Sequence, residues 1–365
     1  MACKETWTDE RILFPKVINM PFGKEGKTLI GIYAQKACWY PEKEKRLIER
    51  VKYLLKLGAD PDIADVNGVT PLTTTCFEYN SGNDIFNLLL SQNVRVNGDP
   101  GHSWNPLSLV ATHVGAKKTL ALLKKGADPN YKCGDSSILH LATSHHDSKG
   151  ENTENIKLLL NAGANPNVLD SCNWSPTDYC IEKGYISYAK LLLDHGAVIT
   201  RGEFLMESAI IKLTEPAIKF LHENGVAINR DQWEESLTRG NVPKVAMLLR
   251  CGACPNSLVF RRTPLAWAFH LRGYDPASLA IAKLLCKAGL DVNGKMYGQS
   301  ILCFLFNDYI NDQSPCLLQI IEMVVSKGGK VPSKAEYDTM LDIAGRERGN
   351  FIELNRIIMK GRLKK

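Results

Sequence analysis

Short runs of apolar residues with helical spacing recur along the chain, and each run ends close to a glycine. In the run that precedes Gly163, the residues Ile156, Leu159 and Leu160 fall at positions i, i+3 and i+4, which places them on one face of a short helix. Gly163 favours the left-handed conformation that ends a helix, and Asn165-Pro166-Asn167 has the composition of a turn. The pattern therefore predicts a helix, a tight stop and a turn.

This pattern returns at intervals of about 33 to 37 residues, shortening to about 27 to 29 residues in two places, which is typical of helical repeat arrays. Clear copies lie at Leu54–Pro61, Leu122–Asn130, Leu191–Ala197, Leu248–Asn256 and Leu284–Asn293, and weaker copies lie at Leu88–Asn97 and Phe220–Asn229. Because each repeat in such an array packs only on its neighbours, the length of 365 residues indicates one elongated array of repeats.

A second signal marks the start of the first helix in many repeats. In Thr70-Pro71-Leu72, threonine is suited to the N-cap and proline to the first helical position. Related signals are Asn105-Pro106-Leu107, Ser175-Pro176-Thr177 and Thr263-Pro264-Leu265, with looser forms at Ser137–Ala142 and Ser300–Leu302. Each repeat is thus predicted to contain a turn, a capped first helix, a loop, and a second helix with a Gly-Ala stop.

The Thr-Pro-Leu opening combined with the Leu-Leu-x-x-Gly-Ala-x-x-Asn closing resembles the ankyrin repeat. The resemblance implies an all-α ankyrin-repeat solenoid of about nine helix-turn-helix units with short hairpin loops and terminal caps. We expect an N-terminal cap at 1–27, repeats at 28–332, and C-terminal capping helices with a basic tail at 333–365. Residues 202–252 lack Thr-Pro-Leu and are shorter, so we expect two degenerate repeats with truncated hairpins there.

Three polar stretches inside repeats predict lengthened loops, at 143–153, 271–278 and 307–315. The resemblance gives His140 a structural role, in which it hydrogen-bonds between repeats. The asparagines that end the Gly-Ala motifs are expected to satisfy turn backbone groups, and the resemblance permits their hydroxylation by a cellular asparaginyl hydroxylase. These asparagines are Asn97, Asn130, Asn167, Asn229, Asn256 and Asn293.

Composition is that of an ordinary soluble protein, with 44% hydrophobic and 23% charged residues and no apolar run long enough to span a membrane. The amino terminus lacks a signal-peptide pattern, and eleven scattered cysteines indicate reduced thiols, so we expect a cytoplasmic protein. The net charge of +6 is mild, and the basic tail is interpreted as a solvated cap. We therefore expect neither nucleic-acid nor membrane binding, and we expect a monomer.

No motif in the sequence predicts catalysis. The segment Pro21–Thr28 ends like a phosphate-binding loop, but Pro21 stands where such a loop needs glycine. Cys251 and Cys254 have metal-ligand spacing without a second pair, and no histidine lies in a recognisable catalytic signature. We expect no catalytic residue, metal, cofactor or small-molecule substrate. The alternative is an ankyrin-targeted enzyme whose active site lies in the degenerate middle or the C-terminal segment.

In a solenoid of this type, the hairpin tips and the first helices form one concave surface. Large aromatic and arginine side chains at the tips have no core to enter, and these residue types dominate protein interfaces. The predicted partner-binding residues are Trp104, Tyr131, Trp174, Arg261, Arg262 and Tyr297. The sequence thus predicts a scaffold that binds a protein partner. Its degenerate repeats and basic tail also resemble the style of ankyrin effectors that intracellular bacteria or large viruses deliver into host cells.

Overall fold

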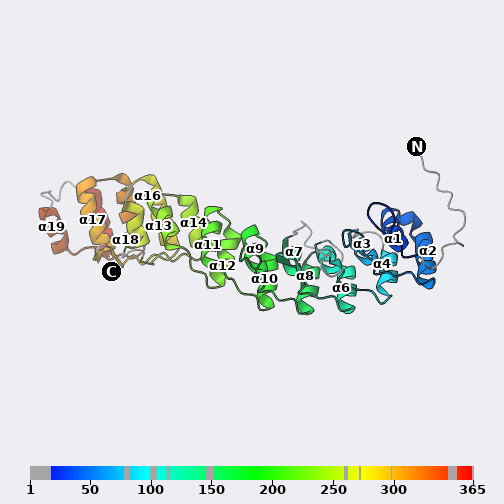
Figure 1. Ribbon diagram of the computed structural model, residues 1–365. Coiled ribbons are helices and arrows are strands. Elements are labelled where there is room, and N and C mark those ends of the chain that lie inside the picture. The colour runs from blue at the N-terminus through cyan, green and yellow to red at the C-terminus, as the bar shows by residue number, and fades with distance from the viewer. Residues whose placement is uncertain are drawn as a thin grey trace. The chain divides into compact units, whose positions relative to one another are not determined.

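The computed structural model shows helices that follow one another in pairs (Figure 1). The structure describes residues 18–77, 83–98, 105–112, 116–144, 152–258, 262–270, 273–296, 298–343 and 352–363. The chain divides into two compact units, Met1–Arg201 and Gly202–Lys365. We call them unit 1 and unit 2 and describe each by itself.

Unit 1 is a stack of helix pairs. Its helices are α1 (Leu29–Trp39), α2 (Glu44–Lys56), α3 (Pro71–Phe77), α4 (Asn83–Leu90), α5 (Pro106–Ala111), α6 (Ala116–Lys124), α7 (Ile138–Ser144), α8 (Asn152–Asn161), α9 (Pro176–Lys183) and α10 (Ile186–Asp194), with a 3-10 turn, η2 (Pro41–Lys43), before α2. The odd-numbered first helices contact one another in sequence from α1 to α9, and each packs on its own second helix. This arrangement confirms an all-α repeat architecture.

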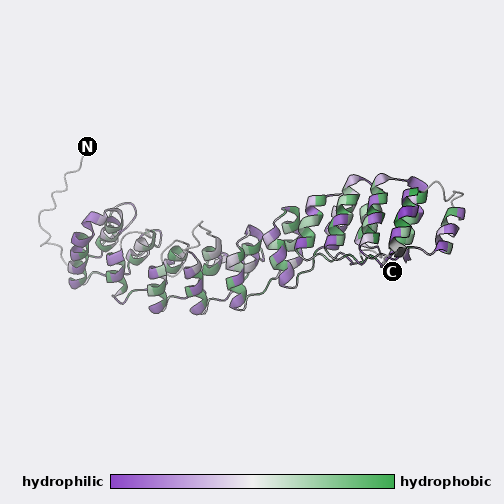
Figure 2. Cartoon of the chain, turned by 180° about the vertical axis from the view of Figure 1, so that it is seen from behind, coloured by the Kyte–Doolittle hydropathy of each residue, from purple (hydrophilic) through white to green (hydrophobic). Residues whose placement is uncertain are grey.

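Unit 2 continues the same pairing. Its helices are α11 (Gly202–Ile211), α12 (Glu215–Glu223), α13 (Arg230–Thr238), α14 (Val242–Arg250), α15 (Pro264–His270), α16 (Pro276–Lys287), α17 (Ile301–Asp312), α18 (Pro315–Ser326), α19 (Lys334–Ile343) and α20 (Ile352–Leu363). The second helices α12, α14, α16, α18 and α20 contact one another in that order. Each helix carries a hydrophobic and a hydrophilic side (Figure 2), as expected of helices that bury one face against the next repeat.

Strands are short in both units. β1 (Lys132–Cys133) and β2 (Ser136–Ser137) pair antiparallel in unit 1, and β3 (Lys295–Met296) and β4 (Gln299–Ser300) pair antiparallel in unit 2. These two hairpins are the named strand pairs in the part of the chain that the structure describes. They lie directly before the first helices α7 and α17, where the sequence predicted hairpin turns.

The predicted helix caps are present where the sequence placed them. Thr70 Oγ1 accepts the backbone N–H of Thr73 at 3.2 Å. The Asn105 side chain caps α5 by accepting the N–H groups of Leu107 and Ser108 at 2.8 and 3.1 Å. At the other end of a repeat, Gly163 has a φ of 91°, which glycine adopts without strain. Local sequence chemistry thus determines where most helices begin and end.

The Asn side chain that ends several of the Gly-Ala motifs bridges to the following repeat. The Asn130 Nδ2 donates to the carbonyl of Gly163 at 2.9 Å, while its Oδ1 accepts the backbone N–H of Asn165 at 2.7 Å. We call this two-bond arrangement the asparagine clamp. Asn167 makes it with Gly196 and Val198, Asn256 with Gly289 and Asp291, and Asn293 with Gly328 and Lys330. These asparagines satisfy turn backbone groups, as expected. The groups belong to the turn of the next repeat.

Replacing Asn130 with alanine is expected to lower the free energy of unfolding by about 1 kcal/mol, because two solvent-exposed hydrogen bonds between repeats are lost. Asn130→Asp should cost less, because a carboxylate still accepts the Asn165 N–H. Urea denaturation followed by circular dichroism measures both. Equal loss for alanine and aspartate would contradict a role for the accepting oxygen.

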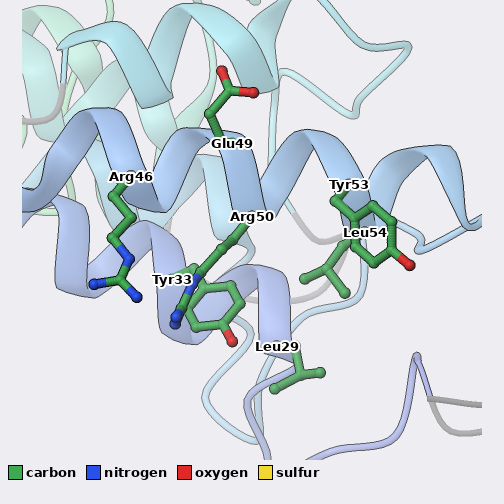
Figure 3. A pocket seen from close by; sticks show the side chains of 7 residues that line it. All are labelled: Leu29, Tyr33, Arg46, Glu49, Arg50, Tyr53 and Leu54. Atoms are coloured by element: carbon green, nitrogen blue, oxygen red, sulfur yellow. The ribbon is translucent and has the colours of Figure 1, made fainter. Parts of the chain in front are cut away.

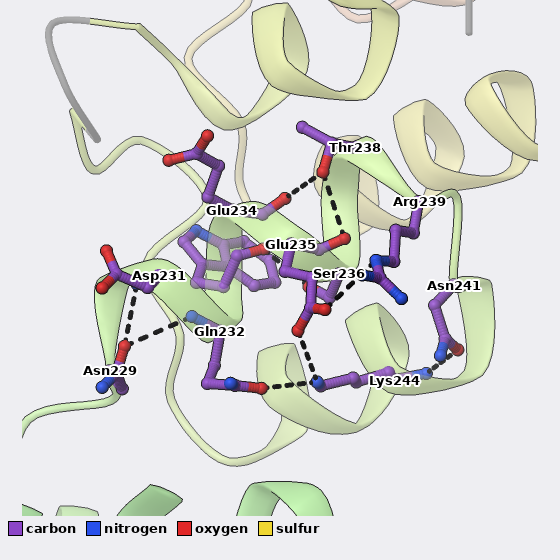
Figure 4. A network of polar contacts seen from close by, with 11 residues as sticks. Asn229, Asp231, Gln232, Glu234, Glu235, Ser236, Thr238, Arg239, Asn241 and Lys244 are labelled. Carbon is purple, nitrogen blue, oxygen red and sulfur yellow. Dashed lines mark hydrogen bonds and ion pairs between the residues drawn. The ribbon is translucent and has the colours of Figure 1, made fainter. Parts of the chain in front are cut away.

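The second short repeat of unit 2 differs from the clamped repeats in its hydrogen bonds. Asn229 stands at the clamp position but caps α13 instead, accepting the N–H groups of Asp231 and Gln232 at 2.8 and 3.2 Å. Lys244 reaches from α14 to Gln232 Oε1 at 2.8 Å and to Glu235 Oε2 at 3.8 Å (Figure 4). Side chains therefore join α13 and α14 within this repeat, and the 226–229 connection that precedes it contains no strand.

The second helices of the short repeats are linked by an exposed bidentate ion pair. Arg250 Nε and Nη2 of α14 donate to the two carboxylate oxygens of Glu215 on α12 at 3.0 and 2.8 Å. The Arg250 hydrogen bond holds the pKa of Glu215 below its ordinary value. The Cys251 thiol also donates to the Glu215 carbonyl, at 3.7 Å.

One predicted loop is a helix. Residues 307–312 complete α17, and the helix ends only at Gln313, which has a φ of 47°. Polar residues here do not interrupt the helix because Ile310 continues the buried stripe of Leu305 and Phe306. The other two predicted loops lie partly outside the described residues, as do 1–17 of the predicted N-terminal cap. α19 and α20 lie in the predicted C-terminal cap.

A lysine lies in the core of unit 1. Lys118 of α6 is 5% exposed, and its Nζ donates to the carbonyl of Thr75 at 2.8 Å. The same ammonium lies 5.5 Å from the centroid of the Phe86 ring. A buried lysine charge requires such partners because leaving water is otherwise unfavourable.

Candidate protein-binding surface

The structure describes three of the six predicted binding residues. Tyr131 and Trp174 lie in unit 1 and Arg262 lies in unit 2, all three half-buried. The predicted Trp104, Arg261 and Tyr297 lie outside the described residues. Tyr131 directly precedes β1, and its backbone N–H donates to the Asp128 carbonyl at 3.3 Å.

The turn that carries Trp174 is fixed by backbone hydrogen bonds. Its N–H donates to Asp170 Oδ1 at 2.9 Å, and its carbonyl accepts the Asp170 N–H at 3.0 Å. His140 of the preceding repeat lies 3.0 Å from the same carbonyl through Nε2, while its Nδ1 lies 2.8 Å from Ser137 Oγ. Because a carbonyl only accepts, Nε2 carries the proton. His140 therefore joins two repeats, as the resemblance implied.

Arg201 lies over the indole of Trp174. The guanidinium carbon is 4.8 Å from the centroid of the ring, within the range of a cation–π interaction. Arg201 therefore covers one face of the half-buried indole ring. The sequence analysis did not identify Arg201, which directly precedes α11.

A buried carboxylate organises the backbone beside this pair. Asp178 is fully buried at the N3 position of α9 and forms a capping box with Ser175, whose Oγ accepts the Asp178 N–H at 3.0 Å. The Asp178 carboxylate also accepts the Thr200 N–H at 3.1 Å, the Thr200 hydroxyl, and the Arg201 N–H at 3.4 Å. Asp178 thus fixes the chain from which Arg201 reaches Trp174.

Unit 2 contains a second arginine–tryptophan pair. The Arg262 guanidinium lies 4.7 Å from the centroid of Trp267, which is 8% exposed in α15. Trp267 was not predicted, although its place two residues after Leu265 in the Thr-Pro-Leu opening would have signalled it. Arg262 and Trp174 belong to different units and are treated as separate contact sites.

A pocket of about 290 Å³ opens on the first helix pair and is lined by Leu29, Tyr33, Arg46, Glu49, Arg50, Tyr53 and Leu54. The Arg50 guanidinium lies 5.6 Å from the Tyr33 ring centroid. Figure 3 shows Glu49 on the opposite side of α2 from Arg46 and Arg50. The pocket lining therefore combines two arginines, two tyrosines and two leucines with one glutamate.

Three buried cysteines, Cys76, Cys180 and Cys251, are poor nucleophiles. Burial raises the pKa of Cys76 and of Cys180 to about 12, and it also raises the pKa of Cys251. A thiol attacks as its thiolate, so raised pKa values oppose reaction. Cys254, the other member of the Cys-x-x-Cys pair, is exposed, and no group of three metal-binding side chains occurs among the described residues.

Comparison with known proteins identifies the repeats. The family model for ankyrin repeats in three copies matches residues 42–133 and 121–203. Residues 42–203 of the chain are ankyrin repeats. The chain is 27% identical over 169 residues to human transient receptor potential cation channel subfamily A member 1. The matched region covers 43% of this chain and 14% of that protein.

A second ankyrin relative is the ankyrin repeat, SAM and basic leucine zipper domain-containing protein 1 of Chlorocebus aethiops and of Papio anubis. Each is 30% identical over 97 residues, which cover 27% of this chain and 20% of the relative. The match therefore spans a fifth or less of the length of these curated relatives. The ankyrin repeats indicate that the chain contains a protein–protein interaction domain. Among the residues that the structure describes, no helix is both long enough and apolar enough to cross a membrane.

Proposed function

We propose that the chain is a scaffold that binds a protein partner through its hairpin turns and first helices, with Trp174 as the main contact of unit 1. The observation that supports this most directly is the ordered Trp174–Arg201 pair on a turn fixed by Asp170 and His140. Tryptophan and arginine on a rigid support lose little conformational freedom on binding, so each contact contributes more to affinity.

The proposal includes Tyr131 as a second contact of unit 1 and Arg262 as the contact of unit 2. The six residues predicted from the sequence form the full proposed set. A monomeric chain, a cytoplasmic location, the absence of catalysis, and delivery into a host cell stay predictions from the sequence. In the degenerate middle, burial raises the pKa of Cys251, which opposes a thiolate nucleophile at that position.

Affinity capture from eukaryotic cytosol tests the proposal with the full chain and three variants. Trp174→Ala should reduce recovery of a specific partner at least tenfold, because central interface tryptophans contribute about 2 kcal/mol or more. Arg262→Ala reports on unit 2 separately. Leu120→Ala is the matched control, because Leu120 is 39% exposed on the second helix α6.

Circular dichroism must show that all variants fold. If the specific partners survive both Trp174→Ala and Arg262→Ala, the proposed face is wrong. If Leu120→Ala removes them as well, binding depends on a different surface or on general stability.

A further inference from the structure

The helix stop at Gly225 has the same backbone conformation as the stops that the asparagine clamp holds. Gly225 has a φ of 84° and Gly163 one of 91°. The Val226 N–H donates to the Leu221 carbonyl at 3.0 Å. In the same way, the Ala164 N–H donates to the Leu159 carbonyl at 2.9 Å. The two stops therefore present the carbonyl of their glycine and the N–H two residues later in the same way.

The stop at Gly225 has no clamp within unit 2. At Gly163, Asn130 binds both the carbonyl and the N–H two residues later. In the described residues of unit 2, no group is bonded to the Gly225 carbonyl or to the Ala227 N–H. Both residues are exposed, so this donor–acceptor pair is available to a ligand.

The pair lies in a groove. A cavity of about 650 Å³ is lined by Gly202, Glu203, the 225–229 connection, Arg230 and Asp231. The groove is open where the connection between α12 and α13 runs without strands. Its aliphatic lining comes from Val226 and Ile228, both half-exposed, and its acidic lining comes from Glu203 and Asp231.

We propose that this groove binds an extended segment of a partner protein and that an asparagine or glutamine of the segment bonds to Gly225 and Ala227. The partner's amide NH₂ donates to the Gly225 carbonyl, and its amide oxygen accepts the Ala227 N–H, as Asn130 does at Gly163. The inference rests on the proposed interaction function but assigns a contact surface apart from the Trp174 turn.

The groove selects a carboxamide over a carboxylate for two reasons. A carboxylate has no donor for the Gly225 carbonyl, and the two acidic residues of the lining, Glu203 and Asp231, outnumber its one cation, Arg230. The chain contains an example at Asp62, whose carboxylate accepts the Arg95 N–H at 2.9 Å and makes only the accepting half of the clamp. Loss of one hydrogen bond and added repulsion predict about tenfold weaker binding of an aspartate segment.

Nuclear magnetic resonance with the full chain, carrying ¹⁵N-labelled glycine and alanine, tests the proposal. The probes are three acetylated and amidated pentapeptides, Thr-Val-Asn-Val-Thr and its versions with central aspartate and central leucine. The asparagine peptide should shift the Gly225 and Ala227 signals and bind about tenfold more tightly than the aspartate peptide. Unshifted signals at millimolar peptide, or equal binding of all three peptides, would overturn the proposal.

Proline substitutions provide a matched pair of variants. Ala227→Pro removes the N–H that donates to the side-chain oxygen of the peptide and should weaken binding of the asparagine peptide about tenfold. Ile228→Pro should leave the affinity for the asparagine peptide unchanged, because the clamped stop at Gly163 carries proline, Pro166, at this place. Equal effects of the two substitutions would also overturn the proposal. Trp174→Ala should leave peptide binding unchanged, so failure here is distinct from failure of the proposed function.

Discussion

Replacing Lys118 with alanine is expected to lower the free energy of unfolding by about 3 kcal/mol, although the substitution removes a charge from the core. The Lys118 ammonium donates to the carbonyl of Thr75 in the last turn of α3, where helix carbonyls lack intrahelical partners. It also lies over the Phe86 ring. Alanine removes both interactions and leaves the space of the long aliphatic stem empty.

Urea denaturation monitored by circular dichroism measures the effect. Lys118→Met separates its causes, because methionine keeps most of the stem and lacks the donor. Lys117→Ala is the matched control, since Lys117 is exposed on the same helix and should change stability by no more than about 0.5 kcal/mol. A loss below about 1 kcal/mol for Lys118→Ala would contradict the assigned role.

Replacing Asp178 with alanine is expected to lower the free energy of unfolding by a similar amount, about 3 kcal/mol. The capping box with Ser175 contributes about 1 kcal/mol, and the buried bonds to the Thr200 and Arg201 backbone contribute the rest. Asp178→Asn should lose less, because the amide keeps one accepting oxygen.

The same denaturation assay distinguishes Asp178 from an ordinary surface acid. Asp194→Ala, at the exposed end of α10, should have an effect within about 0.5 kcal/mol. Thr200→Val removes only the hydroxyl that donates to Asp178 and should cost about 1 kcal/mol. If Asp178→Ala matches Asp194→Ala, the carboxylate does not hold this region.

The helices and their boundaries were largely predictable because their signals are local. Pro71 after Thr70 and the glycine at position 163 act on residues within one helical turn, and the structure confirms both. Residues 307–312 were wrongly assigned to a loop because asparagine and aspartate suggest turns. The buried position of Ile310 keeps this segment helical, and only tertiary contact reveals that.

The candidate site was predicted less completely than the fold. Trp174 was identified from its place before a helix cap, but Arg201 was not, because the two residues are brought together by the stacking of repeats. Trp267 was overlooked although its place two residues after Leu265 is visible in the sequence, and the sequence does not show that the Arg262 guanidinium lies over its ring. Contacts between repeats have partners more than twenty residues away or on another element, so local patterns do not reveal them.

The asparagine clamp touches only main-chain atoms of the repeat that receives it. The receiving N–H groups belong to residues as different as Asp128, Asn165, Val198, Asp291 and Lys330. Mutational drift at these positions therefore leaves the junction intact, and the selective constraint falls on the donating asparagine. A repeat that keeps the glycine stop and its packing faces can therefore receive the clamp whatever side chains its turn carries.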